Sequence, residues 1–122
     1  MQRFIKSSFA DYIRSHAGWI VGAFFPPESP LYSEDVEIRH GVLSGNEIAF
    51  PPHYHTHRVS YMLVTKGELT MKFDGQLTVI KAGEYVVFHP GVTEEGISAK
   101  PGTELIIVRT PSSKREDKVD VT

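Results

Sequence analysis

The feature that most constrains the fold is a succession of short apolar or alternating segments from Trp19 onward, separated by Gly, Pro, Asn and Asp. Alternation with a period of two is typical of strands that bury one face, and turn signals at intervals of roughly ten residues are typical of an antiparallel sandwich or barrel. We therefore predict an all-β fold of about nine strands. By composition the candidate strands are Trp19 to Phe25, Val36 to His40 with Val42 to Leu43, Glu47 to Phe50, His53 to His57, Ser60 to Thr65, Glu68 to Phe73, Gln76 to Ile80, Tyr85 to His89 and Glu104 to Arg109.

Two dipeptides within this region predict tight turns. Lys66-Gly67 and Asp74-Gly75 are each flanked by alternating residues. Asp-Gly suits a type I′ turn, because both central positions of that turn need a positive φ. Two hairpins in succession would form a meander.

The ends of the chain differ in character from this region. Ser7 to His16 has a Ser cap, an acid in the first turn and apolar residues at helical spacing, Phe9, Tyr12 and Ile13, so it predicts a short helix that ends near Gly18. Residues from about 112 are polar and mixed in charge, which predicts a frayed tail. The 122 residues suffice for one domain. We expect a helical lead-in over 1–18, a barrel over 19–111 and a flexible tail over 112–122.

Charge and composition exclude several classes of partner. The net charge of −2 leaves no excess of Lys and Arg for binding nucleic acid or an anionic membrane. The longest apolar stretch, Ala17 to Phe25, is about half of a membrane span, and no secretory signal is evident, so we expect a cytoplasmic protein. Cysteine is absent, so a metal would need N and O ligands.

Three of the six histidines, His53, His55 and His57, occupy alternate positions after Pro51-Pro52. Alternate side chains of a strand share one face, so these imidazoles would point into the same volume and could bind one cation. Imidazole suits Zn, Cu, Fe and Ni. The alternative is that the three rings line a solvated strand face.

The residues around this cluster resemble the first sequence motif of the cupin superfamily. That motif reads HxH, three or four residues, Glu, six residues and Gly. The spacing fits from His53 and His55 to Gly67, with Ser60 at the glutamate position.

A second stretch resembles the second cupin motif, which reads Gly, five residues, Pro-x-Gly, two residues and His. The register fits from Gly83 to Glu94, with His89 at the first proline and Glu94 at the ligand histidine. Together the two matches cover residues 53–94. The resemblance implies a single-domain cupin barrel of the double-stranded β-helix, or jelly-roll, type.

The resemblance also implies a divalent metal ion, Fe, Mn, Ni or Zn. His53 and His55 carry over directly, and Glu94 would complete a set of two histidines and one carboxylate, as in non-haem Fe(II) sites. His57 would be a further ligand, or would turn toward the rim. A slip of one residue would exchange Glu94 for Glu95, and both can instead lie in an exposed acidic loop. The alternative is that the replacement of the family glutamate by Ser60 has abolished metal binding.

The pocket expected around this site is mostly apolar with a few polar groups. Strand parity places Ser60, Met62 and Val64 inward, faced by Tyr85, Val87 and His89. Arg58 can clamp a substrate carboxylate or lie solvated at the rim. The predicted substrate-binding residues are Arg58, Ser60, Met62, Tyr85 and His89.

These features favour a metal-dependent cupin enzyme of dioxygenase or isomerase type that acts on a small oxygenated organic molecule. The alternatives are a metal-free module that binds or senses a small, sugar-like ligand, and metal-independent acid–base catalysis by a pocket histidine. Family resemblance further implies a homodimer.

Overall fold

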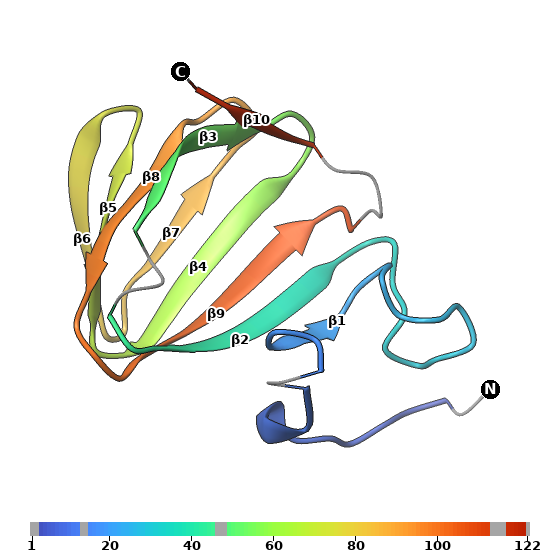
Figure 1. The fold of residues 1–122 in the computed structure, drawn as a ribbon. Helices are drawn as coiled ribbons and strands as arrows, with labels where there is room; N and C mark the ends of the chain where they lie inside the picture. The colour runs from blue at the N-terminus through green and yellow to red at the C-terminus, as the bar shows by residue number, and fades with distance from the viewer. Residues whose placement is uncertain (1–2, 13–14, 46–48, 113–116, 122) are drawn as a thin grey trace.

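A computed structural model describes residues 3–12, 15–45, 49–112 and 117–121 of the chain, and it is an all-β structure of two facing five-stranded antiparallel sheets (Figure 1). The predicted all-β fold is confirmed. The elements are η1 (Phe9–Tyr12), β1 (Trp19–Val21), β2 (Glu37–Leu43), β3 (Phe50–His55), β4 (Val59–Lys66), β5 (Glu68–Phe73), β6 (Gln76–Lys81), β7 (Tyr85–Phe88), β8 (Glu94–Ala99), β9 (Thr103–Thr110) and β10 (Lys118–Asp120).

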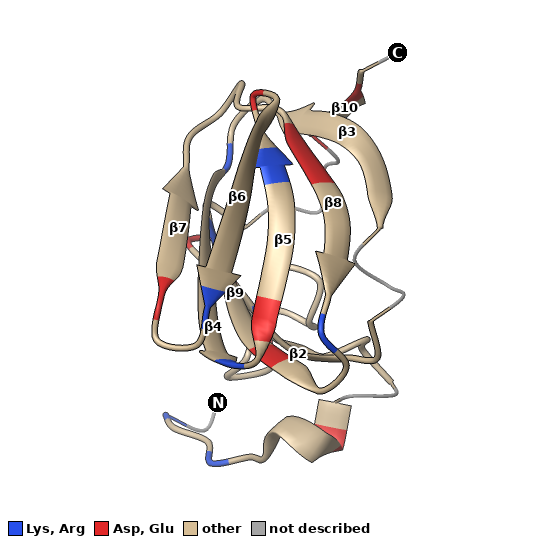
Figure 2. Ribbon diagram, turned by 90° about the vertical axis from the view of Figure 1, so that its left-hand side faces the viewer, with Lys and Arg blue, Asp and Glu red and all other residues tan. Residues whose placement is uncertain are grey.

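The strand order is β1-β2-β9-β4-β7 in the first sheet and β10-β3-β8-β5-β6 in the second. Consecutive strands repeatedly pass from one sheet to the other, as in a jelly roll. Figure 1 shows the two sheets diverging toward the side where β1 and β10 lie. Seen from the side, charged residues lie near the ends of β5, β6, β7 and β8 (Figure 2).

The hydrophobic core fills the space between the sheets. Leu69 and Met71 of β5 are completely buried, because β5 lies between β8 and β6 and its alternate residues face the opposite sheet. The other members of the core are Leu43, Met62, Val64, Ile80, Phe88, Leu105 and Ile107. No helix in the described part of the chain has the length and apolarity needed to cross a bilayer.

The Asp74-Gly75 turn forms as predicted. Phe73 pairs with Gln76, and the two turn residues have φ values of 51° and 78°. Lys66-Gly67 acts differently, because it carries the chain from β4 in one sheet to β5 in the other, so the predicted meander is wrong. Gly67 is required there, since a Cβ at its φ of 82° would lie 2.4 Å from Oγ1 of Thr103.

The N-terminal elements are shorter than predicted. The only helical turn in the described residues is the 3-10 turn η1, and Ile13 lies outside them. β1 ends at Val21 rather than Phe25. The backbone turns after Val21, because Gly22 bonds through its N–H to Leu31 and through its carbonyl to Ser33.

The histidine-bearing segment is a single strand, β3, rather than the two predicted segments Glu47 to Phe50 and His53 to His57, and residues 46–48 lie outside the described residues. The sequence did not predict β8 or β10. Lys118–Asp120 pair with β3, which differs from the frayed tail expected from residue 112. Ser112 is also buried, whereas residues 113–116 lie outside the described residues.

Candidate functional site

A bulge in β3 aligns a histidine with a glutamate across the sheet. Phe50 pairs with Gly96 and His53 with Glu94, so one extra residue is accommodated in β3 around Pro51 and Pro52. Cross-strand partners share a face of the sheet, and so do residues two apart in one strand. His53, His55 and Glu94 therefore all point between the sheets, where they are 8%, 6% and 3% exposed.

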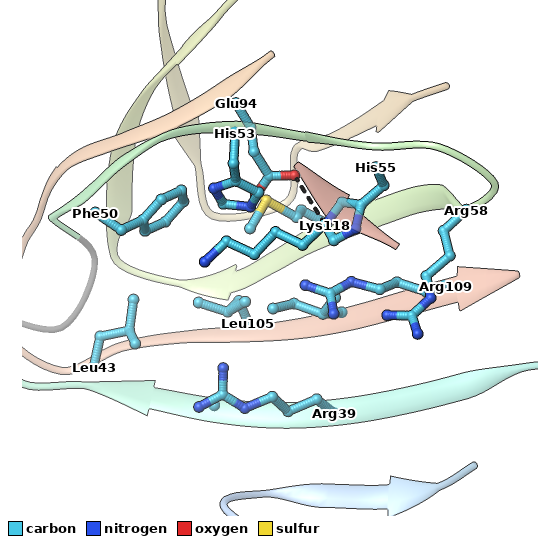
Figure 3. Close-up of a pocket in the computed structure, with 13 residues that line it drawn as sticks. Arg39, Leu43, Phe50, His53, His55, Arg58, Glu94, Leu105, Arg109 and Lys118 are labelled. Carbon is cyan, nitrogen blue, oxygen red and sulfur yellow. Dashed lines mark ion pairs between the residues drawn. The ribbon is translucent and has the colours of Figure 1, made fainter. Parts of the chain in front are cut away.

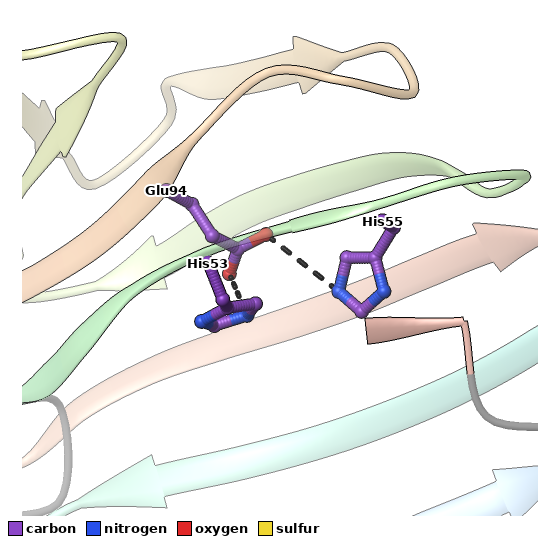
Figure 4. Close-up of side chains that lie close together, drawn as sticks. All are labelled: His53, His55 and Glu94. Carbon is purple, nitrogen blue, oxygen red and sulfur yellow. Dashed lines mark ion pairs between the residues drawn. The ribbon is translucent and has the colours of Figure 1, made fainter. Parts of the chain in front are cut away.

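The side chains of these three residues converge on one point (Figure 4). One ligand atom from each lies within 4.8 Å of the others. Nε2 of His53 is 3.5 Å from Oε1 of Glu94, and Nε2 of His55 is 3.9 Å from Oε2. The two imidazole planes are nearly perpendicular, at 88°. The predicted convergence of the histidines with an acid from a neighbouring strand is thus present.

Contacts behind each ring orient its Nε2 toward the centre. Nδ1 of His55 is 2.8 Å from Oδ1 of Asp117, and Nδ1 of His53 is 3.2 Å from the carbonyl oxygen of Pro51. When each Nδ1–H donates to these oxygens, each Nε2 carries the free lone pair that a metal needs. Carboxylate and carbonyl groups behind ligating histidines are the usual support of metal sites in proteins.

Two of the converging atoms lack a hydrogen-bond partner. Within the described residues, Nε2 of His55 and Oε2 of Glu94 are buried and make no hydrogen bond. Buried polar atoms are rarely left without a partner, because desolvation without compensation costs about 1–3 kcal/mol. The donor set of two imidazoles and one carboxylate could hold a divalent ion, which would satisfy both atoms.

The pKa values of the Glu94 and Asp117 carboxyl groups are shifted in opposite directions. Burial raises the pKa of Glu94 above its ordinary value, although His53, Arg109, His55 and Lys118 act in the other direction. Burial also acts to raise the pKa of Asp117, but hydrogen bonds from the His55 side chain and the His57 N–H, together with the charge of Arg58, lower it overall. Asp117 is therefore ionised and can hold the His55 ring.

The cluster of His53, His55 and Glu94, called the metal-type centre below, lies at one wall of a cavity of about 320 Å³ (Figure 3). Apolar side chains cover part of the wall, and basic side chains extend into the space below the centre in this view. The lining residues are Arg39, Gly41, Leu43, Phe50, His53, His55, Arg58, Met62, Glu94, Leu105, Ile107, Arg109 and Lys118.

Two of the predicted substrate-binding residues line this cavity, Met62 and Arg58. Met62 is 5% exposed and faces the cavity from β4. Arg58 is buried rather than solvated, with Nη1 3.5 Å from Oε2 of Glu37 and Nε 3.5 Å from Oδ1 of Asp117. Ser60 is buried on the same face of β4, but it does not line the cavity and its hydroxyl has no partner in the described residues.

The other predicted site residues lie elsewhere. His57 is exposed because β3 ends at His55, so its side chain does not continue the alternation. Tyr85 is 70% exposed and His89 is exposed, whereas Phe88 is buried, so the expected parity of β7 is inverted. Glu95 is partly exposed and neighbours Glu94 on the opposite face of β8, so the register favours Glu94.

Sequence reasoning missed Asp117, Arg39 and Arg109. Arg109 could have been found, because it continues the alternation of the buried Leu105 and Ile107 in β9. Arg39 likewise shares its parity with the buried Leu43. No pattern marked Asp117, since it lies in a short polar segment.

Comparison with known proteins identifies related folds. The sequence matches Cupin_2, the cupin domain, over residues 39–107. No curated protein matches this sequence. The structure of Pac13 of Streptomyces, a nucleoside dehydratase, superimposes with a TM-score of 0.61 at 10% identity over 73% of this chain and 70% of that chain.

Two further solved structures are similar. KdgF from Halomonas sp. has a TM-score of 0.61 at 15% identity, covering 67% of this chain and 74% of that chain. A cupin-2 domain protein from Shewanella frigidimarina has a TM-score of 0.55 at 24% identity, covering 71% of this chain and 80% of that chain. At these identities the likeness establishes the shared fold.

Proposed function

Because this chain belongs to the Cupin_2 family of cupin domains, we propose that it is a metal-dependent enzyme for a small oxygenated organic molecule. In this proposal His53, His55 and Glu94 hold one divalent ion, Fe, Mn, Ni or Zn. The observation that carries it is the convergence of three buried ligand atoms within 4.8 Å, two of them without a hydrogen-bond partner.

The surroundings of these ligands favour catalysis rather than a closed structural site. Three protein ligands leave positions free, and the ligands face a cavity rather than solid core. An ion held there would supply Lewis-acid activation of a substrate oxygen, or a meeting point for substrate and dioxygen. Leu105, Ile107 and Met62 exclude water from one side, while Asp117 fixes the His55 ring. Isomerase-type and dioxygenase-type reactions both fit this arrangement.

A metal-free binding module is the second candidate. Glu94 has a raised pKa and lies 3.5 Å from His53, so one proton between carboxylate and imidazole would partly satisfy the cluster. The same proton would suit acid–base catalysis without metal. The two candidates differ in whether the folded protein retains a stoichiometric ion.

Metal content tests the proposal. The protein is purified without an immobilised-metal column, dialysed against Zn²⁺, Mn²⁺, Ni²⁺ or Fe²⁺ under anaerobic conditions, desalted and analysed by inductively coupled plasma mass spectrometry. We expect about one ion per chain for one of these metals, and loss of that ion in the His53→Ala/His55→Ala variant. His57→Ala is the matched control, because it removes an exposed imidazole from the same segment. A folded protein that retains no ion would support the metal-free module.

We also propose that the chain forms a homodimer through the outer face of the β1-β2-β9-β4-β7 sheet. Leu63 pairs with Tyr85 there, and Val87 follows on the same strand, at 38%, 70% and 40% exposure respectively. Contiguous exposed apolar residues on a sheet face are typical of protein interfaces. A second copy of the same face would cover them with matching chemistry.

A further inference from the structure

Two arginines on the sheet opposite the metal-type centre form a feature that the proposed function does not use. Arg39 of β2 and Arg109 of β9 lie on neighbouring strands and both line the cavity (Figure 3). Their guanidinium carbons lie 6.0 and 5.4 Å from the ring centroid of Trp19 in β1. One indole therefore supports both cations, which limits the orientations available to them.

Among the described residues, these two arginines have at most one shared carboxylate as a counter-charge. Arg39 donates from Nε to the carbonyl oxygen of Ala17 at 2.8 Å, and within the described residues it has no carboxylate partner. Nη1 of Arg109 is 3.6 Å from Oε2 of Glu37, but its Nε is buried without a hydrogen bond. Glu37 is shared, since it also contacts Arg58 and accepts a hydrogen bond from Ser112.

Repulsion between the two guanidinium groups is a cost that an anion would relieve. Burial and the nearby charge of Arg109 both lower the pKa of Arg39. Placing like charges together in a partly desolvated cavity is unfavourable unless a group of opposite charge lies between them. The guanidinium fork matches the two oxygens of a carboxylate or phosphate with parallel hydrogen bonds.

We propose that Arg39 and Arg109 clamp an oxyanion, the carboxylate or phosphate group of a small organic substrate, on the opposite side of the cavity from His53, His55 and Glu94. The substrate assignment rests on the proposed function, whereas binding of the anion does not need a metal. The apolar wall of Leu43, Phe50 and Leu105 fits the carbon skeleton of such a molecule. The cavity volume of about 320 Å³ is at the lower end for small-molecule sites, so the substrate is a small acid.

The roles of the arginines differ from that predicted for Arg58. Arg58 lies between Glu37 and Asp117, so its charge is used within the protein. Of the three arginines that line the cavity, Arg39 and Arg109 are therefore the ones that would determine specificity for an anionic substrate.

Trp19 provides a direct probe, because it is the only tryptophan of the chain and contacts both guanidinium groups. Its fluorescence is followed while the full chain is titrated with pentanoate, butyl phosphate or neutral pentanamide. Each titration is made with protein treated with EDTA and with protein loaded with Zn²⁺. Arg39→Gln and Arg109→Gln remove each cation, and Arg39→Lys retains the charge without the fork. Lys81→Gln is the control, since it removes an exposed cation at the end of β6.

We expect saturable binding of at least one anion to the metal-free protein and at least tenfold weaker binding of pentanamide. Arg39→Gln and Arg109→Gln should each weaken anion binding about tenfold or more, Arg39→Lys should weaken it less, and Lys81→Gln should leave it unchanged. Preference for pentanoate or for butyl phosphate identifies the anionic group. Circular dichroism and thermal melts establish that each variant is folded.

Three results would overturn the clamp: no anion binding at millimolar concentrations, equal binding of pentanamide and pentanoate, or unchanged anion binding in folded Arg39→Gln or folded Arg109→Gln. Failure of the metal proposal gives a different pattern. The protein would then retain no Zn²⁺ while anion binding and its dependence on Arg39 persist.

Discussion

Asp117 connects three parts of the site through a single carboxylate. Besides the His55 ring, Oδ2 accepts hydrogen bonds from the backbone N–H groups of His57 and Arg58, at 3.1 and 3.2 Å. The end of β3 and the segment that leads into β10 are therefore fixed together. A residue that contacts no substrate thus controls the direction of a proposed metal ligand.

Asp117→Asn should weaken metal binding about 10- to 100-fold, because an amide holds the His55 ring in the required tautomer less strongly. Zn²⁺ affinity, measured by competition with a chromophoric chelator, checks this. Asp120→Asn is the matched control, since Asp120 lies three residues further along, in β10, with its side chain 75% exposed. Equal affinities of the two variants would contradict the role assigned to Asp117.

Glu94→Gln should abolish metal binding and also change how the stability of the metal-free protein depends on pH. Burial raises the folded-state pKa of Glu94, so its favourable contribution to stability is complete below its ordinary pKa and is lost as pH rises through the folded value. In urea titrations of metal-free protein, the wild-type free energy of unfolding should therefore fall relative to that of Glu94→Gln as pH rises above the ordinary carboxyl range. The same variant should lose stoichiometric metal. A constant difference between the two proteins across that pH range would contradict the stability argument.

At the level of elements, the fold is stabilised mainly by the side chains that the strands bury between the two sheets. Leu69 of β5 is fully buried, whereas Leu77 of the neighbouring β6 is 61% exposed. Leu69→Ala should lower the free energy of unfolding by about 2–5 kcal/mol, because it removes buried methyl groups and leaves a cavity. Leu77→Ala should change it by about 0.5 kcal/mol or less. Urea denaturation of both variants measures the difference, and similar losses would contradict the assignment of the core.

The sequence predicted those elements that are marked by alternating apolar and polar residues or by turn-forming residues within the segment itself. β4, β5, β6 and β9 follow the expected segments closely, and the Asp74-Gly75 turn has the expected positive φ values. β8 was missed because its inward-facing residues are Glu94 and Gly96, not large apolar side chains. β10 was missed because three residues of polar sequence pair with β3 only through tertiary context.

The residues of the candidate site could be predicted only where the sequence indicated which alternate residues of a strand face inward. His53 and His55 share a face as their spacing requires, and family spacing indicated Glu94. Parity failed for Tyr85 and His89, because nothing local fixes which face of an edge strand such as β7 turns inward. Long-range partners such as Asp117, 62 positions from His55, leave no local pattern.

At the scale of the whole molecule, the cavity lies between the sheets, and the outer face of the β1-β2-β9-β4-β7 sheet carries the exposed apolar residues Leu63, Tyr85 and Val87. The proposed dimer would cover that outer face without closing the cavity. Leu63→Glu should therefore convert a dimer into a monomer in multi-angle light scattering, while metal content stays unchanged. Leu77→Glu, on the other sheet, is the control, because Leu77 is also exposed. A wild-type protein that is monomeric at high concentration would contradict the dimer.

The proposed metal site is tested most directly by anomalous X-ray diffraction from crystals of the protein grown with Zn²⁺ or Mn²⁺, recorded on both sides of the metal absorption edge. If His53, His55 and Glu94 bind the ion, we expect one strong anomalous peak per chain, at about 2.0–2.2 Å from Nε2 of His53, Nε2 of His55 and a carboxylate oxygen of Glu94. Crystals with no peak there, or with the metal on exposed histidines such as His57 or His89 instead, would contradict it.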